Sequence, residues 1–281
     1  KEEKAKGAKT VIRSKAELDA VMKDLENVSY LVDEVKKGER VKKAPIPFTT
    51  STMQQEASKA LNFSTQKTMR LAQQLYEGVE VKGHGTIGLI TYLRTDSTRI
   101  AEEADAAARA FVKEHYGENY MAAGEPAKKN AGKIQDAHEA IRPTDISLTP
   151  VMVKESLPRD LFRLYQLIWK RFAASRMAPA VYETTMVKIR GGNQLFSAAA
   201  SRLSFDGFMS VYVDADDEEE KGQTMGAMEK GSALSLEKLE PSQHFTQPPA
   251  HYTEASLVKA LEEQGIGRPS TYAPTITSIF A

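Results

Sequence analysis

The sequence predicts a multidomain α+β protein, with helices in its middle and C-terminal parts and an antiparallel β region between them. Helical spacing of apolar residues and helix-capping patterns dominate residues 50–177. From residue 181 the pattern changes to strand-like segments, and the glycine-rich turn at 191–193 is typical of a hairpin. Prolines near residues 45 and 249 interrupt regular structure, so we place domain boundaries there.

The composition indicates a soluble globular protein without a membrane span. The 281 residues are enough for two or three domains, and no apolar run reaches the ~18 residues that cross a bilayer. The absence of cysteine excludes disulfides and thiolate zinc sites and fits a reducing compartment. Because 38 basic and 38 acidic residues give a formal net charge of zero, any phosphate-binding surface must be local.

The first segment combines a helix with a strand. Ser14 and Glu17 form a capping-box pattern before a helix expected over residues 16–28. Residues 29–35 have strand character. The basic stretch 36–47 contains two prolines and is expected to be an irregular connector between domains.

Two helices and a turn-rich segment come next. Ser51 and Gln54 predict a capping box at the start of the first helix, and Ser64 is the expected N-cap of a second helix that ends at Gly78. The glycine-rich residues 79–88 lead into the following strand. This order suggests a helix-turn-helix or winged-helix-like unit, which often binds nucleic acid, although a fold alone does not establish a function.

Residues 88–99, GLITYLRTDSTR, are predicted to form a short strand that turns directly into a helix N-terminus. Alternation along the strand places Ile90, Tyr92 and Arg94 on one face, and residues 96–98 supply N-cap chemistry. A phenol and a guanidinium would then lie beside free backbone N–H groups that attract anions. This arrangement could place a tyrosine nucleophile on a phosphate, whereas the alternative is a tyrosine that only packs.

Further helices frame a basic loop. An alanine-rich helix is expected over about 99–116, and the most apolar helix, over 161–177, is expected to form core. Between them, residues 117–135 carry glycines and lysines. We weigh a solvated loop against a loop that moves over a phosphate backbone.

The motif at 136–144, DAHEAIRPT, combines a histidine with an arginine. On a helix, His138 and Arg142 would lie four residues apart on one face. The zinc motif HExxH fails because Arg142 stands where the second histidine would be. A guanidinium can fork onto a phosphate, and His138 could donate a hydrogen bond beside it. The alternative is a histidine that caps or packs at the edge of the core.

The β region after residue 181 is expected to be small and antiparallel. Its predicted strands cover residues 181–190, 193–205, 208–213 and 233–240. The acidic run 214–220 is expected to be a loop tip that would repel DNA.

The C-terminal part is again helical. Thr253 is expected to cap a helix that ends at Gly265, and a last helix opens after Arg268. Arg268, with the hydroxyls of Ser270 and Thr271 and the helix N-terminus, could form a phosphate clamp. The alternative is ordinary helix-start chemistry.

Three stretches together resemble type IA DNA topoisomerases, specifically the bacterial topoisomerase I branch. They are GLITYLRTDSTR at 88–99, HEAIRPT at 138–144 and YTEASLVKALEEQGIGRPSTYAPTI at 252–276. The resemblance covers about residues 16–279 in the order of the family. It implies a central fragment of the type IA fold, in which a helical, winged-helix-like tyrosine domain is inserted into an antiparallel β arch.

The resemblance also implies a division into four segments. Residues 1–44 would form the first part of the β arch with an N-terminal helix, and 45–178 the helical domain with the active-site tyrosine. Residues 179–249 would form the antiparallel part of the arch, and 250–281 the start of a truncated helical DNA-binding domain.

The activity that the resemblance implies is transient cleavage of one DNA strand. Tyr92 would form a 5′-phosphotyrosine link with single-stranded DNA, another strand would pass, and religation would relax negative supercoils without ATP. A phenol is a weak nucleophile at neutral pH, so Arg94 would stabilise the phenolate and the charge on the phosphoryl oxygens. His138 and Arg142 would hold phosphates in the site. Asp96 would contact DNA or only cap the helix.

Family members also carry an N-terminal Toprim domain whose carboxylates bind Mg²⁺. No such cluster stands in this sequence, since the only DxD pattern, Asp214 and Asp216, lies in the acidic run. We therefore expect a fragment that binds no metal itself, needs the missing Toprim domain as its partner, and does not relax DNA alone. The family further implies a monomer in the bacterial cytoplasm, at the nucleoid.

Two rival functions stay open at this point. One is a winged-helix nucleic-acid-binding module in which Tyr92 only packs. The other is a different tyrosine transesterase such as a tyrosine recombinase, although the arginine and histidine motifs of that family are not found.

Overall fold

The protein is described by a computed structural model of residues 12–123, 138–214 and 225–280. Its chain divides into two compact units. Unit 1 comprises Lys1–Arg40, Tyr182–Leu203 and Gly222–Pro249, and unit 2 comprises Val41–Val181, Ser204–Lys221 and Ala250–Ala281. The boundaries expected near residues 44, 178 and 249 stay predictions about the domains. No helix within the described ranges is both long and apolar enough to cross a membrane.

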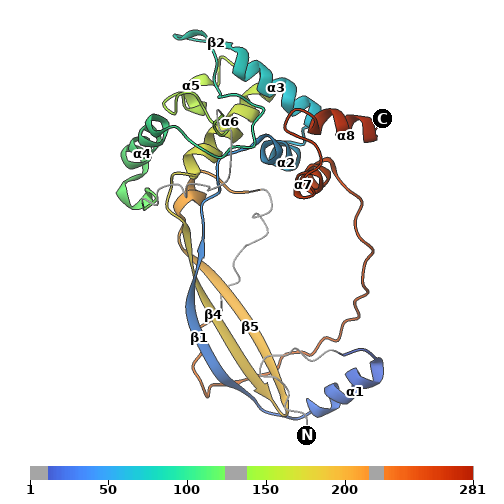
Figure 1. Cartoon of the computed structure of the whole chain (residues 1–281). Coiled ribbons are helices and arrows are strands. Elements are labelled where there is room, and N and C mark those ends of the chain that lie inside the picture. The colour runs from blue at the N-terminus through green and yellow to red at the C-terminus, as the bar shows by residue number, and fades with distance from the viewer. Residues whose placement is uncertain (1–11, 124–137, 215–224, 281) are drawn as a thin grey trace. The chain divides into compact units, whose positions relative to one another are not determined.

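Unit 1 is built on a four-stranded sheet with the order β5-β4-β1-β6, whose long strands β1, β4 and β5 lie side by side in Figure 1. The elements are α1 (Lys15–Asp24), β1 (Tyr30–Lys42), β4 (Ala180–Gly191), β5 (Gln194–Phe205) and β6 (Ala233–Leu234). The hairpin predicted at 191–193 is confirmed. So is the N-cap of α1, since the Ser14 side chain accepts a hydrogen bond from the Glu17 backbone N–H.

The connector expected at 36–47 is wrong for residues 36–42, because β1 continues to Lys42, and right for 43–47, which are irregular. The residues of β1 just before this stretch have charged partners on the neighbouring strand β4. Lys188 pairs with Glu34 at 2.7 Å, and Arg190 pairs with Asp33 at 3.2 Å. These cross-strand pairs stabilise β1, and the sequence pattern predicted it only to residue 35 because residues 36–42 show no apolar alternation.

Two other predicted strands are wrong or much shorter. Residues 208–213 do not form a strand, because a 3₁₀ turn, η2, occupies Gly207–Ser210. Gly207 has a φ of 48°, and Phe208 and Tyr212, four residues apart, are both buried as on a helix. The strand expected at 233–240 reduces to β6. The acidic run expected at 214–220 lies almost wholly outside the described residues.

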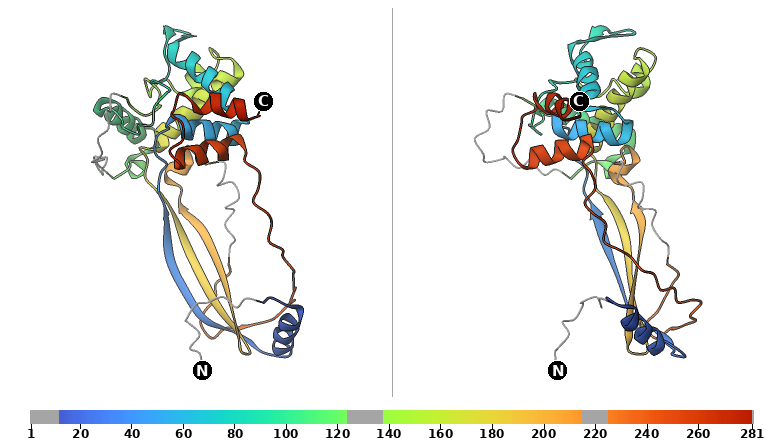
Figure 2. Two further views of the ribbon diagram at one scale, coloured as in Figure 1. Left: turned by 45° about the vertical axis from the view of Figure 1, so that its right-hand side comes forward. Right: turned by 90° about the vertical axis from the view of Figure 1, so that its right-hand side faces the viewer.

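Unit 2 carries the remaining helices, of which α2, α3, α4 and α5 lie around α6 in Figure 1; Figure 2 shows the same helices from two further sides. The helices of this unit are α2 (Thr50–Leu61), α3 (Thr65–Glu77), α4 (Glu102–Tyr116), η1 (Glu118–Tyr120), α5 (Pro150–Val153), α6 (Arg159–Ala174), α7 (Glu254–Glu263) and α8 (Tyr272–Phe280), with a small hairpin of β2 (Val79–Val81) and β3 (Gly85–Ile87). The predicted core helix is confirmed: Leu164, Tyr165 and Ile168 on α6 are fully buried. The Tyr165 hydroxyl donates to the Leu148 carbonyl at 2.6 Å.

The start of α2 differs from the prediction by two residues. Thr49 is the N-cap and forms the capping box with Thr52, while Ser51 lies inside the helix. Gln54, expected to complete the box, is fully buried. Each residue of the Thr-Thr-Ser-Thr run at 49–52 carries a hydroxyl that can cap a helix, so sequence alone could not select Thr49.

The helix α7 packs along α2 and reaches the start of α3. Glu262 accepts a hydrogen bond from the Ser51 hydroxyl at 2.7 Å, and Glu254 accepts one from the Thr65 backbone N–H at 2.6 Å. The second contact places a carboxylate on the free N–H groups at the N-terminus of α3. The C-terminal helices thereby fix the position of α3, whose other end lies at the candidate site.

Candidate functional site

The segment 88–99 is irregular and forms neither the strand nor the helix start that the sequence predicts. Its contacts are an isolated bridge from Ile90 to Pro143 and backbone bonds from Leu89 to Leu75 and Thr144. The helix expected at Asp96 begins only at Glu102, after an Ala101 N-cap that has no side-chain hydrogen bond. The helix predicted to start at Asp96 therefore places no N-terminus next to Tyr92.

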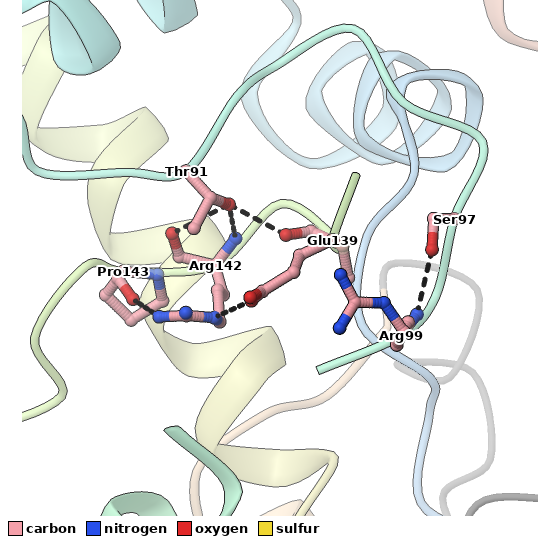
Figure 3. Close-up of polar contacts among 7 residues, drawn as sticks. Thr91, Ser97, Arg99, Glu139, Arg142 and Pro143 are labelled. Carbon is pink, nitrogen blue, oxygen red and sulfur yellow. Dashed lines mark hydrogen bonds and ion pairs between the residues drawn. The ribbon is translucent and has the colours of Figure 1, made fainter. Parts of the chain in front are cut away.

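Thr91 joins this segment to the HEAIRPT motif. Its hydroxyl donates to the Ala140 carbonyl at 2.7 Å and accepts from the Arg142 N–H at 3.0 Å, and its own N–H donates to the Arg142 carbonyl at 2.9 Å (Figure 3). Ile141 forms a bridge to Phe48. The motif is therefore extended, and the prediction that His138 and Arg142 share a face of a helix is wrong.

Thr50 holds the backbone on both sides of Arg94. Its buried hydroxyl lies 2.7 Å from the Leu93 carbonyl and 2.9 Å from the Thr95 N–H. The backbone N–H of Thr50 also donates to the Thr95 carbonyl at 2.9 Å. The first turn of α2 thus fixes three consecutive residues with Arg94 at their centre.

Tyr92 lies between two other rings. The Tyr76 ring of α3 meets it edge-on, with centroids 5.5 Å apart, and the His138 ring lies 5.1 Å away at an interplanar angle of 32°. Tyr92 is half-buried, whereas His138 is exposed. The two flanking rings restrict the Tyr92 side chain and leave the site open to solvent at His138.

Arg94 lines a cavity of about 440 Å³ between α3 and α8, together with residues that include Met69, Pro269 and Ser270. Its Nη1 donates to Gln73 Oε1 at 3.0 Å. In the described part of the chain, no carboxylate lies within ion-pair distance of this guanidinium. The cavity therefore has a positive charge that no carboxylate of the described residues neutralises.

Arg142 differs in this respect. Its Nε pairs with Glu139 at 2.8 Å, and its Nη1 donates to the Pro143 carbonyl at 2.9 Å, as Figure 3 shows. The Arg142 side chain is 12% exposed. Much of its donor capacity is used within the motif, so Arg142 holds the motif together.

The remaining predicted residues lie in three places. Asp96 is exposed and caps no helix. Ser270 lines the Arg94 cavity. Arg268 and Thr271 form a local turn before α8, in which the Thr271 hydroxyl accepts from the Arg268 N–H at 2.8 Å and Arg268 Nη1 donates to the Gly267 carbonyl at 2.9 Å. The structure brings Arg94 and Ser270 together across 176 residues of sequence.

Among the residues that the structure describes, no group of three histidine, aspartate or glutamate side chains could hold a metal ion. These residues therefore do not fit the Mg²⁺ that the family implies.

Sequence reasoning missed Thr50, Gln73 and Tyr76. Tyr76 lies on the apolar stripe of α3, but it is 40% exposed and contacts the Tyr92 ring. Gln73 lies three residues before Tyr76 on the same helix face, a spacing that becomes informative only once Tyr92 is placed beside α3.

The candidate site combines a tyrosine restrained between two rings with an arginine, two residues later, that has no carboxylate partner among the described residues. A sequence model of the family described as DNA topoisomerase matches residues 1–281. The chain belongs to this family, in its bacterial type IA topoisomerase I branch.

A solved structure supports the assignment. Full-length topoisomerase I from Thermotoga maritima is similar with a TM-score of 0.78 and 39% sequence identity, over 93% of this chain and 42% of that chain. The chain thus spans less than half the length of this relative.

Proposed function

We propose that Tyr92 is the nucleophile that cleaves single-stranded DNA in a type IA topoisomerase reaction. The observation that carries this proposal is the half-buried Tyr92 ring between Tyr76 and His138, two residues before an arginine without a carboxylate partner among the described residues. A restrained phenol with an available guanidinium two residues further along the same segment suits attack on a phosphodiester.

The proposed step exchanges one phosphoester for another. The Tyr92 oxygen bonds to phosphorus, the bond to the 3′ oxygen breaks, and the phenol proton leaves while the departing 3′ oxygen takes up a proton. The product is a 5′-phosphotyrosine link, and attack by the 3′ hydroxyl after strand passage reverses the step. Because the ester bond is conserved, no ATP is needed for relaxation of negative supercoils.

We assign Arg94 to the charge that develops on the phosphoryl oxygens. His138, next to Tyr92, would donate to the scissile or a neighbouring phosphate. Arg142 would support the same segment while it stays paired with Glu139.

We propose that the DNA strand continues along the Arg94 cavity. Ser270 lines this cavity, and Arg268 and Thr271 lie in the adjacent turn before α8. Asp96 is the remaining candidate for a DNA contact.

In our proposal, relaxation of supercoiled DNA requires a Toprim domain in addition to the residues of this chain. The chain would act as a monomer together with a Toprim domain of the same protein, which would hold Mg²⁺. We expect the isolated chain to show no relaxation of supercoiled DNA, and Mg²⁺-dependent relaxation by the purified chain would contradict this.

The test uses a single-stranded oligonucleotide labelled at one end, with this chain joined to the remaining segments of a bacterial topoisomerase I. A 5′-phosphotyrosine link leaves a 3′-end label on the protein in a denaturing gel and releases a 5′-end label. We expect this pattern from the native sequence and from Tyr76→Phe, and no adduct from Tyr92→Phe. An adduct in Tyr92→Phe would show that another residue is the nucleophile.

One observation supports the rival function. The order α2, α3 and the β2-β3 hairpin is compatible with a winged-helix unit, in which Tyr92 would only pack between rings. Binding of the oligonucleotide without any adduct in the joined protein would favour this nucleic-acid-binding module.

A further inference from the structure

Side chains from one face of α3 contact both Tyr92 and Arg94. Gln73, Tyr76 and Glu77 lie three and four residues apart, so they share that face. Tyr76 contacts the Tyr92 ring, and Gln73 contacts the Arg94 guanidinium. One helix face therefore touches both members of the proposed reactive pair.

The Gln73 amide is fixed at both of its ends. Its Oε1 accepts from Arg94 Nη1 at 3.0 Å, and its Nε2 donates to Glu77 Oε1 at 2.6 Å. If the amide were flipped, its NH₂ group would face the guanidinium, which is also a donor. Its carbonyl oxygen would face the Glu77 carboxylate, which is also an acceptor. The Glu77 charge therefore selects the orientation in which Gln73 can accept from Arg94.

A neutral amide also leaves the charge of Arg94 available. A carboxylate at position 73 would form an ion pair and offset the positive charge, as Glu139 does for Arg142. The Gln73 bond uses one of the five guanidinium N–H groups, so four still point elsewhere. Arg94 is thus held in place without being neutralised.

We propose that Gln73 is a positioning residue, oriented by Glu77, that aims Arg94 at the phosphate attacked by Tyr92. This inference rests on the proposed function for its chemical meaning. The hold on Arg94 itself is a property of the chain before DNA binds, so it can be measured separately.

The first measurement is the order of the Arg94 Nε–H vector by ¹⁵N relaxation in the purified chain, with the signal assigned by its loss in Arg94→Lys. In Gln73→Leu we expect Arg94 to lose its order, because the acceptor is gone while leucine preserves the helix. Gln74→Leu, at the exposed next position on α3, is the matched control and should leave Arg94 ordered. Equal order of Arg94 in Gln73→Leu and the native chain would overturn the proposal.

The second measurement separates position from charge with Gln73→Glu. This variant should keep Arg94 ordered, but the new carboxylate should neutralise its charge. The slope of log affinity against log salt for a dT oligonucleotide should therefore decrease in magnitude by about 0.7. Gln73→Leu should keep that slope and instead slow adduct formation in the joined protein about tenfold or more, with less change in KM. An unchanged slope in Gln73→Glu, or an unchanged rate in Gln73→Leu, would contradict the proposed role.

The two proposals fail in different ways. If an adduct forms without Tyr92, the proposed function is wrong although Arg94 can still lose its order in Gln73→Leu. If Tyr92 forms the adduct but Arg94 stays ordered in Gln73→Leu, only the positioning role is wrong.

Discussion

The imidazole of His138 lies against the ring of Tyr92, with centroids 5.1 Å apart and planes inclined by 32°. These residues are 46 positions apart in the sequence, and the hydrogen bonds of Thr91 to the HEAIRPT motif bring them together. The exposed side chain of His138 makes this contact at the open edge of the site, where a DNA strand would enter.

The contact predicts that the His138 ring contributes to packing against Tyr92, whereas its nitrogens contribute to DNA affinity. His138→Phe keeps an aromatic ring against Tyr92 but removes the hydrogen-bond donor. We expect single-stranded DNA affinity to fall about five- to tenfold, while the free energy of unfolding changes by less than about 0.5 kcal/mol. Fluorescence anisotropy and urea unfolding measure the two effects. His115→Phe is the control, since His115 also stacks on a ring, that of Phe111, and an equal loss there would refute a specific contact.

The different partners of Arg94 and Arg142 predict different salt dependences. Arg94→Ala should lower the slope of log affinity against log salt by about 0.7, the value for one phosphate contact on a single strand. Arg142→Ala should change this slope less, because Glu139 already neutralises Arg142. Titrations of a dT oligonucleotide at several salt concentrations measure both slopes, and a larger change for Arg142 would reverse the assignment.

The buried hydroxyl of Thr50 predicts a stability effect at the site. Thr50→Val keeps the shape of the side chain but leaves the Leu93 carbonyl and the Thr95 N–H without this partner. We expect a loss of about 1–3 kcal/mol in the free energy of unfolding by urea. Thr50→Ser retains the hydroxyl and should lose less than half as much. Equal losses in the two variants would mean that the methyl group, and not the hydroxyl, matters.

The pKa of Asp105 predicts a pH-dependent contribution to stability. Burial acts to raise this pKa, but hydrogen bonds from Arg109 and Arg176 outweigh it and hold the pKa below its usual value. A lowered folded-state pKa stabilises the fold above the unfolded-state pKa of about 3.9, and the contribution disappears as pH falls through the folded-state value. Asp105→Asn should therefore destabilise the chain near pH 7 and progressively less below about pH 4.

Urea unfolding at a series of pH values measures this change. Glu114→Gln removes an exposed carboxylate from the same helix and serves as the control. A destabilisation by Asp105→Asn that is the same at pH 7 and pH 3 would exclude the proposed pairing.

The sequence predicted those elements whose hydrogen bonds are local. Ser14 and Ser64 cap the helices that follow them, and Gly78 and Gly117 end helices as expected. Such signals depend on groups three or four residues apart, and a single sequence displays them directly.

The geometry of the candidate site could not be predicted from the sequence. The bonds of Thr91 to Ala140 and of Thr50 to Leu93 join residues 49 and 43 positions apart. These partners take up backbone groups that a strand or helix would otherwise pair internally, so the segments that looked regular are irregular. The role of Gln73 depends in turn on that irregular path.

The hydrogen bond between Glu254 of α7 and the Thr65 N–H at the start of α3 has a consequence for the chain during its synthesis. Glu254 lies 189 residues after Thr65, whose N–H it accepts. At ribosomal speeds of about 5–20 residues per second, roughly 10–40 s pass between the two. During that interval the Thr65 N–H lacks its carboxylate partner, although Ser64 already caps α3, and the α2 surface that α7 covers is open. The nascent chain therefore exposes this surface until α7 emerges.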